Sequence, residues 1–356
     1  MKEVCFVLQY SMENMDADLL ADEIESVEEN EIADIEEFIR DHQGSVGLLR
    51  TFVEVAESFK KMEAKFNKLK MPMKGIERMG ARDVIALARS IASEISDETM
   101  KKIDQMIADN RLVVGGLVSD EYIDDETKRA MEIFSEFDFL PEACGPKYFE
   151  ELDVINMPGD GDSKEGLDKA DAPILIHEVA HAMTSVNLCS LFCESPATMM
   201  EVISAKFMEA RGHGEMTTMH SYLKNIAQNG EDAAALLYLF DVYAEKGMIT
   251  EEDVKTFYDK TDGAGIETVI EDVGYFIGMT SGIVLADDVK NKGELKNVLE
   301  IFNNGDMTSD QKMQKLNLEP KRISTTIERV LGEKISEQEK GQVAKKQADR
   351  NNERPI

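Results

Sequence analysis

The chain has few cysteines, little positive charge and no long uninterrupted apolar run. Its four cysteines, Cys5, Cys144, Cys189 and Cys193, include no Cys-x-x-Cys pair, so no disulfide framework is indicated and a reducing compartment is the simplest expectation. The apolar piece within residues 1–10 is too short for a signal peptide, and no later stretch approaches membrane-spanning length. We therefore expect a cytoplasmic protein with no membrane segment.

Positive charge is scarce relative to negative charge. Lysine and arginine number 40 against 71 aspartate and glutamate residues, which gives a formal net charge of −31. Nucleic acid and anionic membranes carry the same sign, so we expect neither as a partner. The charge favours solubility and is compatible with neutral or basic peptides as ligands.

Apolar residues recur mostly at helical spacing. A stripe of this kind runs through Leu49, Phe52, Ala56, Phe59 and Phe66, and similar stripes predict helices along most of the chain. The strand candidates are few, and they are Val4–Leu8, Leu112–Val118 and Leu152–Met157. The sequence predicts a mainly α fold with a small edge β-sheet beside the helix at residues 174–186.

A length of 356 residues allows one large or two medium domains. Proline and glycine gather between Leu140 and Tyr148, which suggests a division near residue 150. We expect an N-terminal helical lobe at residues 1–150, a catalytic lobe at 151–335 and a polar tail at 336–356 that is either a solvated helix or disordered.

One motif in the second lobe carries chemistry. The apolar run from Ile174 to Met183 contains His177-Glu178-Val179-Ala180-His181, and residues four apart share one face of a helix. His177 and His181 can therefore bind one zinc ion, with Glu178 close enough to reach a water on that metal. Pro173 suits the first turn of this helix, because proline lacks the donor that a helix start leaves unpaired.

A catalytic zinc needs a third protein ligand, and two glutamates downstream are candidates. Ser195-Pro196 resembles a helix cap followed by proline at the first helical position. A helix that starts there and doubles back brings Glu201 level with the histidines, which favours Glu201 as the ligand. Glu194 is the alternative, and it requires the second helix to start earlier.

These residues resemble the gluzincin zinc peptidases. The stretch from His177 to Ser204 is similar to the active-site segment of thermolysin, whose glutamate ligand also follows the second histidine by twenty residues, at the position of Glu201. The segment Glu194–Glu201 also resembles thimet-type oligopeptidases, in which the first glutamate binds the metal. Gly274–Gly282 is similar to a helix near the substrate in those enzymes. Thermolysin has an aspartate where this chain has Ala205, so the resemblance does not identify the group that orients the histidine rings.

The resemblance implies a two-lobed metallopeptidase, and the motif implies its chemistry. Zinc lowers the pKa of its water, Glu178 takes the proton and passes it to the leaving amine, and the metal polarises the scissile carbonyl. The oxyanion needs a further neutral donor. The candidates for this role are His213, His220, Tyr222 and Tyr275.

We therefore expect a zinc-dependent hydrolase that cleaves short or unfolded peptides. The alternative is an acidic helical binding or scaffold protein in which the zinc is structural or the site is retained without turnover.

Overall fold

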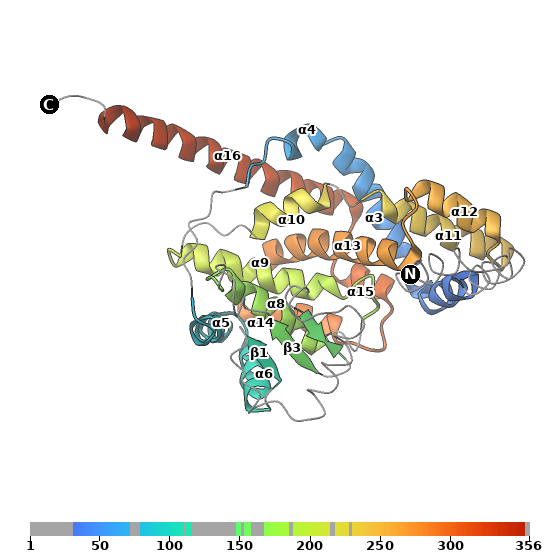
Figure 1. Cartoon of the computed structure of the whole chain (residues 1–356), viewed down its shortest axis with the longest axis horizontal. Helices are drawn as coiled ribbons and strands as arrows, with labels where there is room; N and C mark the ends of the chain where they lie inside the picture. The colour runs from blue at the N-terminus through green and yellow to red at the C-terminus, as the bar shows by residue number, and fades with distance from the viewer. Residues whose placement is uncertain are drawn as a thin grey trace, which may run out of the picture.

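The structure, a computed structural model, describes residues 31–71, 79–109, 111–114, 147–150, 153–157, 167–184, 188–213, 218–227 and 230–352. Within these ranges the chain is mainly helical with one small sheet (Figure 1). The strand predicted at Val4–Leu8 and residues 115–118 of the strand predicted at Leu112–Val118 lie outside the described residues.

The helices account for most of the described chain, beginning with a helical segment at residues 31–41. The elements that follow are η1 (Gln43–Ser45), α3 (Val46–Lys60), α4 (Glu63–Phe66), α5 (Ala81–Ile95), α6 (Asp97–Ala108), β1 (Leu112–Val114), β2 (Lys147–Phe149), β3 (Val154–Met157), α8 (Asp171–Thr184), α9 (Glu194–Ala210), α10 (Thr218–Ile226), α11 (Asp232–Lys246), α12 (Glu251–Lys260), α13 (Ile266–Asp288), α14 (Lys292–Phe302), α15 (Ser309–Lys315) and α16 (Pro320–Asn352).

The predicted apolar stripes lie in the core, as their spacing indicates. The stripe from Leu49 to Phe66 is buried, but the helix breaks after Lys60 and resumes as α4. The polar tail is helical to Asn352, and in Figure 1 the end of α16 projects from the body of the molecule. Of the two predicted states of the tail, the structure has the helix.

The sheet has the strand order β1-β3-β2, with β1 parallel and β2 antiparallel to β3. The strand predicted at Leu152–Met157 is present as β3, which is the central strand and has all four of its residues buried. The edge nearest α8 is β2, which the sequence did not suggest. Three residues are too few to give a recognisable alternation of apolar and polar positions.

The predicted metal motif lies on α8, next to two further helices and the sheet. α9 packs against α8, which carries the motif, and also against α13, which lies beside it in Figure 1. α8 also contacts β2 and β3. The motif helix is therefore held between a helical layer and the small sheet.

α13 is the one helix among the described residues that is long and apolar enough to cross a membrane, contrary to our expectation that no such stretch exists. In the structure, 78% of its most apolar window is buried within the fold. Its composition is therefore accounted for by its place as a core helix.

Buried side chains from both predicted lobes form one continuous core, from Ile35 to Leu331. The sheet also joins them, because β1 precedes residue 150 and β3 follows it. The described residues thus contain no break in the core at the predicted boundary, and the division into lobes stays a prediction.

Candidate metal centre

The two histidines of the motif face each other across one turn of α8. Their Nε2 atoms lie 3.2 Å apart, because residues i and i+4 share a helix face. Pro173 lies in the first turn of the helix, as predicted. The apolar neighbours Leu175, Ile176 and Val179 are fully buried and hold α8 in place.

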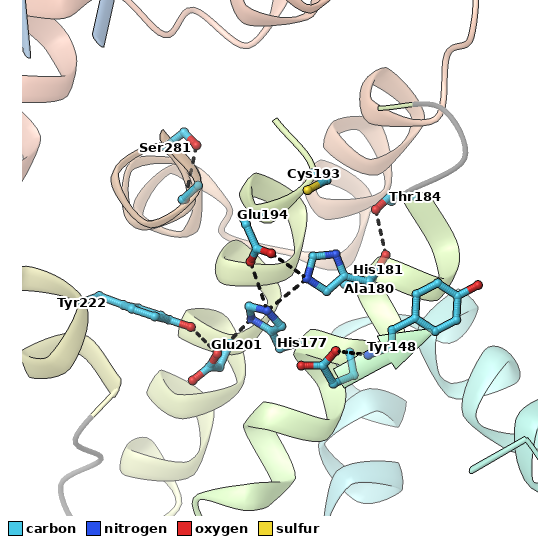
Figure 2. Close-up of polar contacts among 12 residues, drawn as sticks. Tyr148, His177, Ala180, His181, Thr184, Cys193, Glu194, Glu201, Tyr222 and Ser281 are labelled. Carbon is cyan, nitrogen blue, oxygen red and sulfur yellow. Dashed lines mark hydrogen bonds and ion pairs between the residues drawn. The ribbon is translucent and has the colours of Figure 1, made fainter. Parts of the chain in front are cut away.

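The third group at this site is the carboxylate of Glu194. Its Oε2 lies 3.3 Å from His177 Nε2 and its Oε1 lies 3.4 Å from His181 Nε2. Figure 2 shows this carboxylate pointing at both rings from the first turn of α9. One ligand atom from each residue can be chosen so that all three lie within 4.8 Å of one another, a grouping that could hold a metal ion.

The distances within this group fit a small tetrahedral ion. Zinc binds nitrogen and oxygen at about 2.0–2.1 Å, so neighbouring ligand atoms in a tetrahedral site are about 3.3 Å apart. The contacts of 3.2, 3.3 and 3.4 Å are close to this separation, but the two contacts of Glu194 are made by its two different oxygens. Taken with one atom from each residue, the group lies within 4.8 Å. Glu194 Oε2 is also buried and has no hydrogen-bond partner. This oxygen is therefore available to a cation between the three side chains.

Glu201, the glutamate favoured from the sequence, has a different place. Its Oε2 lies 3.0 Å from Nδ1 of His177, the ring nitrogen that does not face His181. Tyr222 donates its O–H to the same carboxylate oxygen. Figure 2 follows this chain from Tyr222 through Glu201 to His177. The contact is close but is not aligned as a hydrogen bond, since Nδ1 of His177 has no hydrogen-bond partner. A carboxylate at this position is suited to orient a metal-binding ring, the role that Ala205 left unassigned.

The helix-rise argument for Glu201 was wrong in its starting point. α9 begins at Glu194, so Ser195 and Pro196 lie inside its first turn and do not precede the helix. Proline is tolerated there because the first-turn N–H groups have no partner within the helix. Glu194 and Glu201 are two turns apart on the same face of α9. Of the two, Glu194 contacts the Nε2 atoms of His177 and His181.

The charges in this group stabilise one another. Burial by itself lowers the pKa of His177, but contacts with Glu194 and Glu201 outweigh it and raise that pKa well above its usual value. Burial raises the pKa of Glu194, and its contacts with His177 and His181 more than compensate, so the pKa lies well below the usual range. Burial and the charge of Glu201 raise the pKa of Tyr222, which keeps its phenol protonated as a donor.

Glu178 points toward the sheet. Its side chain is buried, and its Oε2 accepts a hydrogen bond of 2.7 Å from the backbone N–H of Tyr148 in β2. Tyr148 pairs with Ile155 of β3, and within the described ranges no second strand pairs with β2. The predicted general base therefore lies between the helix of the histidine pair and strand β2.

Only one of the four predicted oxyanion donors remains a suitable candidate. His213 is exposed beyond the C-terminal end of α9, and Glu201 is already about 14 Å from that end at helical rise. His220 is fully buried in α10, and Tyr222 donates to Glu201. Tyr275 on α13 is 42% exposed. Burial of its ring and then the charge of Glu194 raise its pKa, so its phenol stays neutral.

Sequence reasoning missed three features of this centre. These are the edge strand at Tyr148, the contact of Glu201 with Nδ1, and the packing of Gly278 on Glu194. Only the last left a signal, because Gly274, Gly278 and Gly282 recur every four residues on one face of a helix. Comparison with known proteins gave no further guide, since no family model, curated protein or solved structure matches this chain.

Proposed function

We propose that this protein is a zinc-dependent peptide hydrolase of the gluzincin type. The observation that carries the proposal is the convergence of His177, His181 and Glu194 within 4.8 Å of one another, with Glu178 next to them beside the sheet. The two-lobed gluzincin arrangement belongs with this proposal. A zinc ion held by these three side chains would polarise a water molecule and the scissile carbonyl.

The chain's own residues have distinct roles in this scheme. Glu178 accepts a proton from the attacking water and later delivers it to the leaving amine. The N–H of Tyr148 fixes the direction of the Glu178 carboxylate. Tyr275, a neutral phenol on the exposed side of α13, supplies the additional donor for the oxyanion.

The edge strand supports a peptide as the substrate. A strand edge can pair with an extended chain, and no strand among the described residues pairs with the outer side of β2, beside Glu178. The N–H of Tyr148 on that edge is bonded to Glu178, so a peptide would pair with the other backbone groups of the edge. An extended segment is available in short or unfolded peptides, whereas folded proteins rarely present one. This supports the substrate class expected from the sequence.

The alternative function is a binding or scaffold protein with a structural zinc. Structural sites are closed by four protein ligands, whereas catalytic sites use three and leave one position for water. Among the described residues the group that could hold a metal consists of three side chains. This count favours catalysis over a structural role.

The test is the variant Glu178→Gln. We expect the unmodified protein to contain about one zinc per chain by elemental analysis and to cleave a quenched peptide library. Glu178→Gln keeps the zinc but loses cleavage by about 10²–10⁴-fold, because only the proton acceptor is removed. The matched control is Glu267→Gln, at an exposed position of α13, which leaves both quantities unchanged.

Two results would contradict the proposal. Zinc in the unmodified protein without cleavage of any peptide would favour the scaffold alternative. Zinc content that survives alanine at both His177 and His181 would rule out both uses of this site.

A further inference from the structure

The close approach of α13 to α9 has its tightest point at the metal ligand Glu194. A Cβ atom added at Gly278 would lie 2.1 Å from Glu194 Cβ and 2.9 Å from its carbonyl carbon. Carbon atoms in contact are normally about 3.5–4.0 Å apart. Any side chain at position 278 therefore requires the start of α9 to move by more than about 1 Å.

Two further contacts hold the same end of α9. Ser281, one turn after Gly278, is hydrogen-bonded through its Oγ to Ser195 Oγ over 2.7 Å, and the same hydroxyl lies 2.6 Å from the carbonyl oxygen of Ile277. Both hydroxyls are buried. Gly274 lies against the carbonyl oxygen of Ser190, just before α9 begins. In Figure 2 the helix that carries Ser281 passes beside Glu194. Contacts with α13 therefore hold the chain both before Glu194, at Ser190, and after it, at Ser195.

We propose that α13 positions the third metal ligand, and that Gly278 and Ser281 are positioning residues for zinc binding. The proposal rests on the proposed function, because it takes Glu194 as a ligand. Metal–ligand distances tolerate about 0.2 Å of error, which is much less than the displacement that a methyl group at Gly278 would cause. Neither residue touches the metal or the substrate.

If Gly278 served only helix packing, its replacement would lower the stability of the protein without a specific effect on zinc binding. Gly282 offers a matched control, because a Cβ there would lie 2.6 Å from the Thr198 side chain on the same helix pair. Thr198 is one turn after Glu194 and is not part of the metal group, although its side chain contacts Tyr222. Both variants therefore disturb the interface of α13 with α9. Gly278→Ala does so at the proposed ligand Glu194, and Gly282→Ala at Thr198, which is not a ligand.

The experiment measures zinc affinity by competition with a chromophoric chelator, together with the melting temperature of each metal-free variant. We expect Gly278→Ala to weaken zinc binding by about 10- to 100-fold, the usual effect of losing a group that positions a ligand. Gly282→Ala lowers zinc affinity by less than Gly278→Ala does, at a similar loss of thermal stability, because it reaches the site only through Thr198 and Tyr222. In a Glu194→Gln background, Gly278→Ala adds little further loss, because both changes act through the same carboxylate.

Ser281→Ala tests the proposal without adding volume. It removes the bond to Ser195, and we expect a folded protein with severalfold weaker zinc binding. If Gly278→Ala does not fold, this variant decides alone. Unchanged affinity in Ser281→Ala, or equal affinity losses in the two glycine variants, would overturn the proposal. A wild-type protein that binds no zinc would instead contradict the proposed function.

Discussion

At the scale of single residues, the two nitrogens of His177 have different partners. Nε2 faces His181 and Glu194, whereas Nδ1 faces Glu201. A metal-binding histidine needs both kinds of partner, since the second one fixes the ring and its tautomer. If the proposed metal site is correct, the two glutamates of α9 have separate tasks that can be measured separately.

Glu194→Gln and Glu201→Gln should differ in zinc affinity. We expect the zinc affinity of Glu194→Gln to fall by well over 100-fold, because a ligand and its charge are removed. Glu201→Gln should lose about 10- to 100-fold, because the ring of His177 is only less well oriented. Chelator competition at constant pH measures both values. The reverse order would make Glu201 the ligand, as the helix-rise argument held.

Tyr222→Phe should weaken zinc binding by about tenfold through Glu201. The change removes only the O–H that donates to the buried Glu201 carboxylate, and a group behind a metal-binding histidine typically contributes an effect of this size. Chelator competition, with far-UV circular dichroism to verify folding, is the measurement. Tyr243→Phe on α11, outside the metal group, is the control. Equal affinities of the two variants would show that Tyr222 has no part in the site.

At the scale of elements, α12 illustrates a helix start that depends on one carboxylate. Asp253 accepts hydrogen bonds from the backbone and hydroxyl of Thr250 and pairs with Lys246 at 2.8 Å. Burial works against its charge, but Lys246 and Thr250 outweigh this and lower the pKa of Asp253 to about 2. Because the folded pKa lies below the value of 3.8 for a free carboxyl, this stabilisation is present above that value and is lost as the pH falls toward 2.

Asp253→Asn should therefore destabilise the protein by about 1 kcal/mol near neutral pH, as the loss of a helix cap typically does. The melting temperatures of the two proteins should converge as the pH is lowered from about 5 to about 2. Thermal denaturation across this pH range measures the difference. A gap that stays constant with pH would mean that the charge of Asp253 does not contribute.

At the scale of the whole molecule, the proposed ligands come from two helices packed within one core. His177 and His181 lie on α8 and Glu194 on α9, and the side chains of both helices belong to the continuous core. An ion bound by all three would therefore link two parts of the core. The unfolded chain does not hold these groups together, so the ion binds the folded state preferentially.

Zinc should raise the melting temperature of the metal-free protein. At free zinc about 1,000-fold above its Kd, the added free energy of unfolding is about 4 kcal/mol, which corresponds to a shift of about 5–10 °C. Scanning calorimetry of the chelator-treated protein, with and without zinc, measures the shift. Calcium, which prefers oxygen ligands, should have no effect. A His181→Ala variant that still shows the zinc shift would place the bound ion elsewhere.

The sequence by itself determined the features that depend on local periodicity. The helical stripes, the shared face of His177 and His181, the proline in the first turn of α8 and the helical character of the residues after Glu194 all follow from the geometry of a single helix. The strand at residues 112–114 was also within reach, because its β-branched residues form a recognisable run.

The tertiary structure alone decided which groups from different elements meet. The first residue of α9, and with it the choice between Glu194 and Glu201, depends on how that helix packs against α13. The edge position of β2, the contact of Tyr222 with Glu201 and the distance of His213 from the cluster likewise depend on the relative placement of elements. Such contacts join residues far apart in the chain, and no local pattern of residue types encodes a distance between two helices.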